Sequence, residues 1–76
     1  MNKARRTELE SLANKANEVK NDLENIRDEE QEYLDNMPEG LQASEKSYLA
    51  QNAIFALDSA IESLDSAIAE IDTAIE

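Results

Sequence analysis

The sequence predicts an all-α protein, an antiparallel two-helix coiled-coil hairpin that we expect to pair with a second copy into a four-helix bundle. Apolar residues recur at alternating steps of three and four in both halves of the chain, which is the heptad pattern of packed helices. The only proline and the only glycine lie between these halves. The 76 residues form at most one domain, whose own core is marginal.

The first predicted helix runs from about residue 3 to residue 36. The stripe expected to pack on the second helix, its seam, comprises Leu9, Leu12, Ala16, Val19, Leu23, Ile26, Tyr33 and Met37. Glu30 occupies one position of this series. A buried carboxylate needs a partner, so we expect Glu30 to reach water or to pair with Lys46 of the second helix. The alternative is that Glu30 sets the register or belongs to a docking surface.

The predicted loop covers residues 37–44. Pro38 removes a backbone donor and ends the first helix, while Gly40 permits a positive φ. We expect a short turn near Pro38 with Leu41 turned inward. Ser44 is suited to cap the next helix, because its hydroxyl can accept a bond from a free backbone N–H.

The second predicted helix runs from about residue 45 to residue 75 and consists of seven-residue repeats. Its seam, which we also expect to serve oligomerisation, comprises Ile54, Leu57, Ile61, Leu64, Ile68 and Ile71, and the pattern continues to Ile75. A column of alanines precedes the seam at Ala53, Ala60, Ala67 and Ala74. Aspartates follow the seam at Asp58, Asp65 and Asp72, and we expect them to stay in water.

The charges and the apolar surplus both suggest how the helices assemble. An antiparallel hairpin places the bases Lys3, Arg5 and Arg6 beside the acids Glu70, Asp72 and Glu76 and beside the negative end of the second helix dipole. The second helix is apolar over more than one stripe. Because so short a chain often gains stability by association, a homodimer is expected to cover the surplus.

The composition excludes several function classes. The chain has no His and no Cys, so acid–base catalysis near neutral pH, nucleophilic catalysis and the usual metal sites lack their residues. We therefore expect no enzyme activity and no catalytic, cofactor-binding or metal-binding residues. No apolar run is long enough for a membrane span or a secretory signal, so the expected setting is the cytoplasm.

An acidic run at residues 28–35 is the most distinctive polar feature. The predicted partner-binding residues within it are Asp28, Glu29, Glu30, Glu32, Tyr33 and Asp35. Carboxylates spaced along a rigid helix can imitate DNA phosphates and occupy a basic groove, and the net charge of −11 fits this role. The simpler interpretation is a solvated face. The same net charge disfavours direct binding to nucleic acid.

The three aromatic residues, Tyr33, Tyr48 and Phe55, all fall in the half of the hairpin next to the loop. We expect them to form a small aromatic core that caps the bundle. The alternative is an anchor cluster for a partner, because aromatic side chains are common binding hot spots.

The loop region Asp35–Glu45, the preceding residues 27–32 and the trailing Ala-Ile-x-x-Leu repeats resemble those of short acidic helical-hairpin proteins of bacteriophages and mobile elements. The resemblance implies a phage or prophage origin and action inside a bacterial host cell. It also implies inhibition of host defence proteins, among them CRISPR and restriction enzymes. No site residue follows from the resemblance.

The first functional hypothesis is a non-enzymatic module that docks its acidic helix on a basic, nucleic-acid-binding host or defence protein and inhibits it. One alternative is a purely structural coiled-coil oligomerisation module. A further alternative is sequestration of a small ligand between hairpins.

Overall fold

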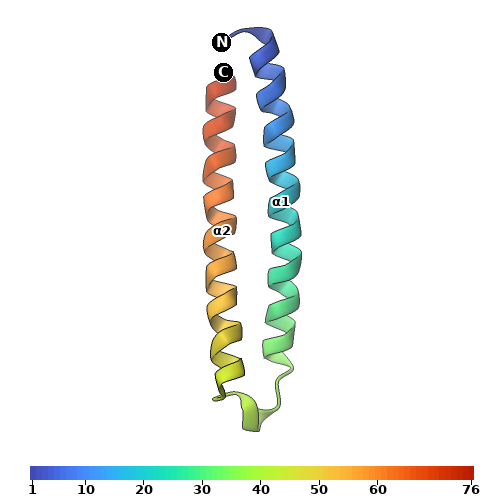
Figure 1. The fold of residues 1–76 in the computed structure, drawn as a ribbon, viewed down its shortest axis with the longest axis vertical. Helices are drawn as coiled ribbons and strands as arrows, with labels where there is room; N and C mark the ends of the chain where they lie inside the picture. The colour runs from blue at the N-terminus through green and yellow to red at the C-terminus, as the bar shows by residue number, and fades with distance from the viewer.

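The computed structural model describes residues 1–76 as two long antiparallel helices joined by a tight loop (Figure 1). Helix α1 spans Lys3–Asp35, the short 3-10 helix η1 spans Glu39–Leu41, and α2 spans Glu45–Ile75. The Cα atoms extend over 59 × 14 × 12 Å, and both termini lie at the end opposite the loop. The predicted all-α hairpin is therefore confirmed, with helix bounds that agree to within one residue. Pairing into a four-helix bundle stays a prediction.

Side-chain caps fix where both helices begin. The Oδ1 atom of Asn2 accepts a hydrogen bond from the backbone N–H of Arg5 at 2.8 Å, which starts α1. The hydroxyl of Ser44 accepts one from the backbone N–H of Ser47 at 3.4 Å, as the sequence predicts. Each cap satisfies an N–H group that has no partner within its own helix.

The loop differs from the prediction at two residues. Gly40 does not adopt a positive φ, because it lies inside η1, where the backbone keeps right-handed helical angles. Leu41 is exposed and not turned inward, since η1 lies beyond the last turns of both helices (Figure 1). Met37 is the residue that becomes buried at this end of the seam.

The core is thin because each helix buries only one stripe. The buried residues are Ala13, Met37, Ser47, Ala50 and Ile54. The α2 seam lies where the sequence predicts it. From Ile54 toward the C-terminus it continues through the half-buried residues Leu57, Ile61, Leu64, Ile68, Ile71 and Ile75.

The prediction of the α1 seam is wrong at every second position. The predicted seam residues Leu12, Val19, Ile26 and Tyr33 are each 50–52% exposed. The residues one place later, Ala13, Lys20, Arg27 and Leu34, are buried or half-buried in their stead. Two physical causes fit this rotation. Ala13 lets the helices approach closely, while the stems of Lys20 and Arg27 cover apolar surface as their charged ends reach α2.

The predicted aromatic core does not form. Tyr33, Tyr48 and Phe55 are all at least half exposed. Tyr33 borders a hollow together with Lys46, whereas Phe55 borders a separate hollow together with Gln31. Tyr48 and Phe55 are seven residues apart, so they share one side of α2 that lies off its seam, and Tyr33 is on the other helix.

Candidate protein-interaction surfaces

One side of the hairpin, here called the polar flank, carries two ion pairs between the helices. The Nζ atom of Lys20 lies 2.7 Å from an Asp65 carboxylate oxygen, and the Nε atom of Arg27 lies 2.8 Å from an Asp58 carboxylate oxygen. The two pairs are seven residues apart on each helix, so they repeat once per heptad. Asp65 and Asp72 are exposed as predicted, and Asp58 is half-buried. The pairing of Asp58 and Asp65 with bases of α1 is a contact that the sequence did not predict.

The ion pairs draw both bases toward α2. The Lys20 side chain is only 22% exposed, and its hydrogen bond to Asp65 raises the pKa of the ammonium above its ordinary value of 10.5. The hydrogen bond to Asp58 likewise raises the pKa of the Arg27 guanidinium. Both bases also approach an acid of their own helix, Glu24 at 3.8 Å and Asp28 at 3.2 Å. Their positive charge is thus matched by nearby carboxylates.

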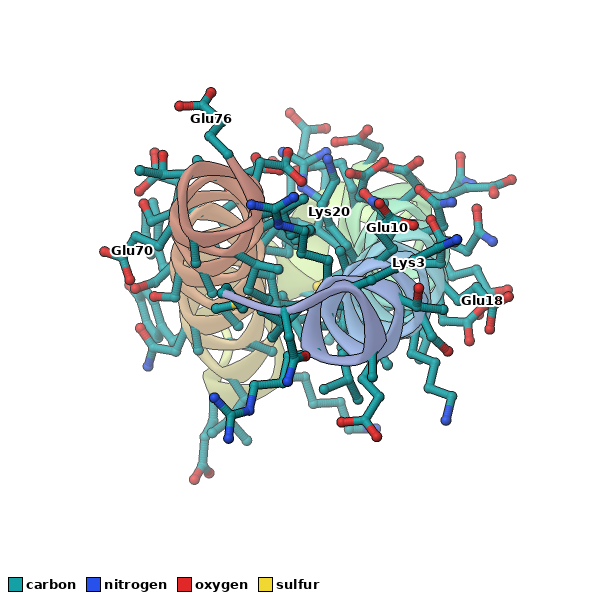
Figure 2. The ribbon with its side chains drawn as sticks, turned by 90° about the horizontal axis from the view of Figure 1, so that it is seen from above. Lys3, Glu10, Glu18, Lys20, Glu70 and Glu76 are labelled. Carbon is teal, nitrogen blue, oxygen red and sulfur yellow. The ribbon has the colours of Figure 1, made fainter.

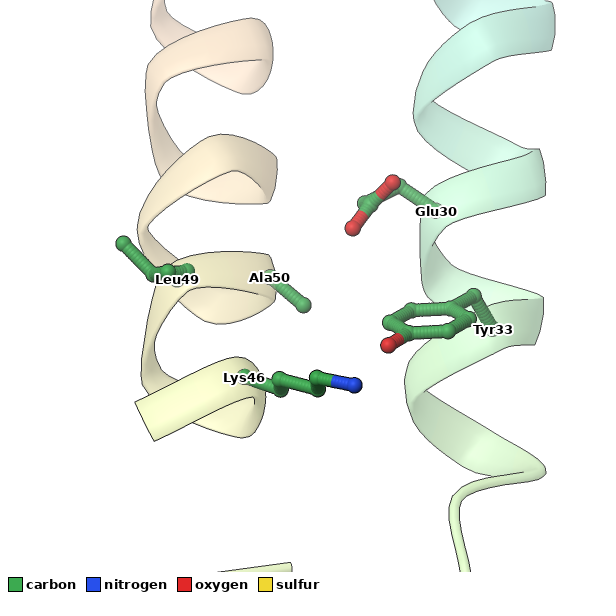
Figure 3. A pocket seen from close by; sticks show the side chains of 5 residues that line it. All are labelled: Glu30, Tyr33, Lys46, Leu49 and Ala50. Carbon is green, nitrogen blue, oxygen red and sulfur yellow. The ribbon is translucent and has the colours of Figure 1, made fainter. Parts of the chain in front are cut away.

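The structure brings together four of the six predicted partner-binding residues. Asp28, Glu29, Glu32 and Asp35 are exposed on the side of α1 that faces away from α2. Asp28 accepts a hydrogen bond from Arg27, and Asp35 accepts one from Gln31 at 2.9 Å. Glu30 is separate from this group, because it is half-buried and turned toward α2 (Figure 3).

The acidic patch extends further up α1 than the sequence predicts. We define the acidic surface as the six exposed acids of α1 between positions 18 and 35: Glu18, Asp22, Asp28, Glu29, Glu32 and Asp35. Glu18 points away from α2, whereas Lys20 lies between the two helices (Figure 2). Lys20 and Arg27 are the only bases in this stretch, so its outer side carries no base. The heptad spacing of Lys20 and Arg27 against Asp65 and Asp58 is the signal that could have revealed this.

Glu30 and Lys46 face the same open hollow but do not form an ion pair. The hollow is about 390 Å³ and is lined by Glu30, Tyr33, Lys46, Leu49 and Ala50 (Figure 3). The ion pairs between the helices involve Lys20 and Arg27 alone, so the predicted pairing of Glu30 with Lys46 is wrong and Glu30 reaches water. A hollow so open to solvent does not enclose a small ligand.

The side opposite the polar flank is apolar and is here called the apolar flank. It consists of the α1 column Leu12, Val19, Ile26 and Tyr33 and the α2 column Ala53, Ala60, Ala67 and Ala74. Every member directly precedes a seam residue, and such positions adjoin in an antiparallel pair of helices. Tyr33 and Lys46 line one hollow, and Lys46 stands seven residues before Ala53, which places both columns on this side.

The bases near the N-terminus remain free. Lys3, Arg5 and Arg6 form no ion pair, although the two chain ends lie close together (Figure 1). The predicted closeness of the two chain ends is confirmed (Figure 1), but no ion pair forms with Glu70, Asp72 or Glu76. Long exposed side chains gain little from pairing in water and lose rotational freedom, which explains the absence of such pairs.

Neither helix is both long and apolar enough to cross a membrane. The carboxylates form no group of three or more that is placed to hold a metal ion. No protein family, curated protein or solved structure matches this chain.

Proposed function

We propose that the protein is a non-enzymatic binding module that docks its acidic surface on a basic, nucleic-acid-binding protein and blocks it. One observation carries the proposal: Lys20 and Arg27 turn inward to Asp65 and Asp58, which leaves the outer side of α1 acidic from Glu18 to Asp35. An unbroken acidic strip attracts a basic groove more strongly than a mixed surface does.

The spacing of the acids supports imitation of a nucleic-acid strand. Six acids from position 18 to position 35 span roughly 26 Å of helix at about 1.5 Å per residue. This gives one charge per roughly 4–5 Å, near the ~3.4 Å spacing of phosphates along one strand of DNA. The acids stand on a continuous helix that is already ordered, so little conformational entropy is lost on binding.

The resemblance to short acidic phage proteins guides the choice of target. We take the target to be a nucleic-acid-binding host or defence protein in the bacterial cytoplasm. Binding that replaces phosphate contacts weakens steeply with salt, so the complex should dissociate as ionic strength rises.

Capture from a bacterial lysate at low and high salt tests the proposal with two variants of equal net charge. The first reverses three acids of the acidic surface that do not border the apolar flank, Asp28→Lys, Glu32→Lys and Asp35→Lys. The second reverses three exposed acids of α2, Glu62→Lys, Glu70→Lys and Glu76→Lys. We expect the first variant to lose a salt-sensitive nucleic-acid-binding partner that the wild type and the second variant retain.

Circular dichroism of both variants shows whether the helices are intact, so that a loss of capture is assigned to the surface. Equal capture by the two variants at low salt would contradict the proposal, because net charge alone would then govern binding.

A second candidate is a structural oligomerisation module that acts as a homodimer, and the half-exposed Leu12, Val19, Ile26 and Tyr33 favour it. Replacing Ile61 and Leu64 by Asp should then remove assembly and activity together. The two candidates separate cleanly, because reversal of the α1 acids leaves the apolar flank unchanged. Reversal of the α1 acids should abolish function only if the first candidate function is correct.

A further inference from the structure

We propose that the apolar flank is the interface of a two-fold symmetric dimer in which both loops lie at the same end. In this dimer the large apolar column of each α1 packs on the alanine column of the partner's α2. The proposal specifies the face and the orientation of the homodimer of the second candidate. The apolar contacts of this dimer do not involve the acidic surface, of which only Asp22 and Glu29 lie at the rim of the interface.

The apolar flank is unusually free of charge for so acidic a chain. Between Leu12 and Tyr33 the α1 column holds four large apolar side chains, and the α2 column holds only alanine from Ala53 to Ala74. Each large side chain is about half exposed (50–52%), and they recur every seven residues along the rod. A row of this kind is typical of a surface that another protein covers.

The register of the hairpin makes the two columns match in height. Lys20 pairs with Asp65 and Arg27 pairs with Asp58, so seven residues along α1 correspond to seven residues back along α2. By this register Tyr33, Ile26, Val19 and Leu12 stand within one residue of the height of Ala53, Ala60, Ala67 and Ala74, respectively.

A two-fold axis along the rod sets α1 of one copy over α2 of the other at the same height. Each large side chain of the α1 column then packs on an alanine of the partner copy, and the space beside each small alanine accommodates the larger side chain. With the loops at opposite ends, α1 lies on α1 and α2 on α2. That arrangement stacks Ile26 and Val19 on equally large side chains and alanine on alanine, which crowds one side and leaves a gap on the other.

The charges at the rims favour the same arrangement. Lys15, Asp22 and Glu29 border the α1 column, whereas Leu49, Ala56, Ser63 and Glu70 border the α2 column. With the loops together, Lys15 comes level with Glu70 of the partner copy, an opposite charge, and Asp22 and Glu29 come level with the uncharged Ser63 and Ala56. With the loops apart, the acidic rims of both α1 helices adjoin, and like charges repel.

The available area is sufficient for a stable dimer. The Cα envelope of the rod is 59 Å long and 14 Å wide. One face therefore offers roughly 800 Å² per copy, about the share of each partner in a standard protein interface.

Light scattering and a matched pair of variants test the dimer. The wild type should have about twice the 8.5 kDa mass of one chain. Val19→Glu places a charge in the apolar flank, whereas Phe55→Glu places it on α2 at a residue that is 70% exposed and outside that flank. We expect Val19→Glu to weaken dimerisation at least 10-fold and Phe55→Glu to leave it unchanged. A monomeric wild type or a dimeric Val19→Glu at equal concentration would overturn the interface.

A spin label on Gly40→Cys tests the orientation. The chain has no other Cys, and a Cβ atom at Gly40 meets no atom within 4 Å. With the loops together, two labels lie one bundle width apart, roughly 20–30 Å, because neighbouring helix axes are about 10 Å apart. A label distance near the 59 Å length of the rod would overturn the orientation. Either failure leaves the capture assay for the acidic surface unaffected, so the two proposals are tested separately.

Discussion

At the scale of single residues, Ile54 and Phe55 are chain neighbours in opposite environments. Ile54 is 6% exposed and packs in the seam, whereas Phe55 is 70% exposed. Hydrophobicity alone would rank Phe55 as a core residue at least equal to Ile54. Their positions in the heptad decide otherwise, because a helix in a hairpin buries a single stripe.

Ile54→Ala should therefore lower the free energy of unfolding by about 2 kcal/mol or more, since it removes buried methyl groups and leaves a cavity. Phe55→Ala should change it by less than about 0.5 kcal/mol, as is usual for surface substitutions. Urea unfolding followed by circular dichroism measures both values. A larger loss for Phe55→Ala than for Ile54→Ala would show that the α2 seam is misplaced.

Lys20 makes the stability depend on pH in the alkaline range. Its folded-state pKa is raised above 10.5 mainly by the hydrogen bond to Asp65. The stabilising contribution is therefore complete below the unfolded pKa and is lost as the pH rises through the higher folded pKa. Lys20→Met removes it at every pH. We expect the difference in melting temperature between wild type and Lys20→Met to shrink above about pH 10.5, where an unchanged difference would speak against the ion pair.

At the scale of elements, the loop accommodates its glycine without needing it. Gly40 has no positive φ, and a Cβ atom there would lie in open space. Gly40→Ala should stabilise the protein by about 0.4–1 kcal/mol, because alanine restricts the unfolded chain more than glycine does. Thermal unfolding measures the change, and a lower melting temperature would indicate a left-handed backbone at this residue.

The same scale shows what the sequence could predict. The α2 seam repeats Ile and Leu with only alanine beside it, so one stripe stands out and was predicted. In α1, two columns flank the shared positions Leu9, Ala16 and Leu23, and the sequence pattern favours the more apolar of the two. The structure turns Lys20 and Arg27 inward in its place, because their partners Asp58 and Asp65 are on α2. A helix read alone cannot reveal such a preference.

The acidic site was predicted in part for the same reason. Asp28, Glu29, Glu32 and Asp35 are adjacent in sequence and exposed, so a local pattern found them. Glu18 and Asp22 join the surface only because Lys20, between them in sequence, is drawn to Asp65. That step depends on the register between two helices and not on either helix alone.

At the scale of the whole molecule, the net charge of −11 opposes folding, because the two helices that pack together are both acidic. Salt reduces the range of this repulsion from about 30 Å at 0.01 M to about 10 Å at 0.1 M. The two exposed ion pairs weaken as well, but each contributes little. The melting temperature should therefore rise over this salt range, and a fall would mean that ion pairs dominate the stability.

Both proposals depend on the register that turns Ala13, Lys20, Arg27 and Leu34 toward α2 and leaves Leu12, Val19, Ile26 and Tyr33 outside. Nuclear Overhauser contacts from the methyl groups of Ile54, filtered to detect only contacts within one chain, test this register directly. Leu34 and Ile54 border the same hollow, so their methyl groups should be in contact. Strong contacts within one chain from Ile54 to Ile26 or Tyr33, with none to Leu34, would contradict it.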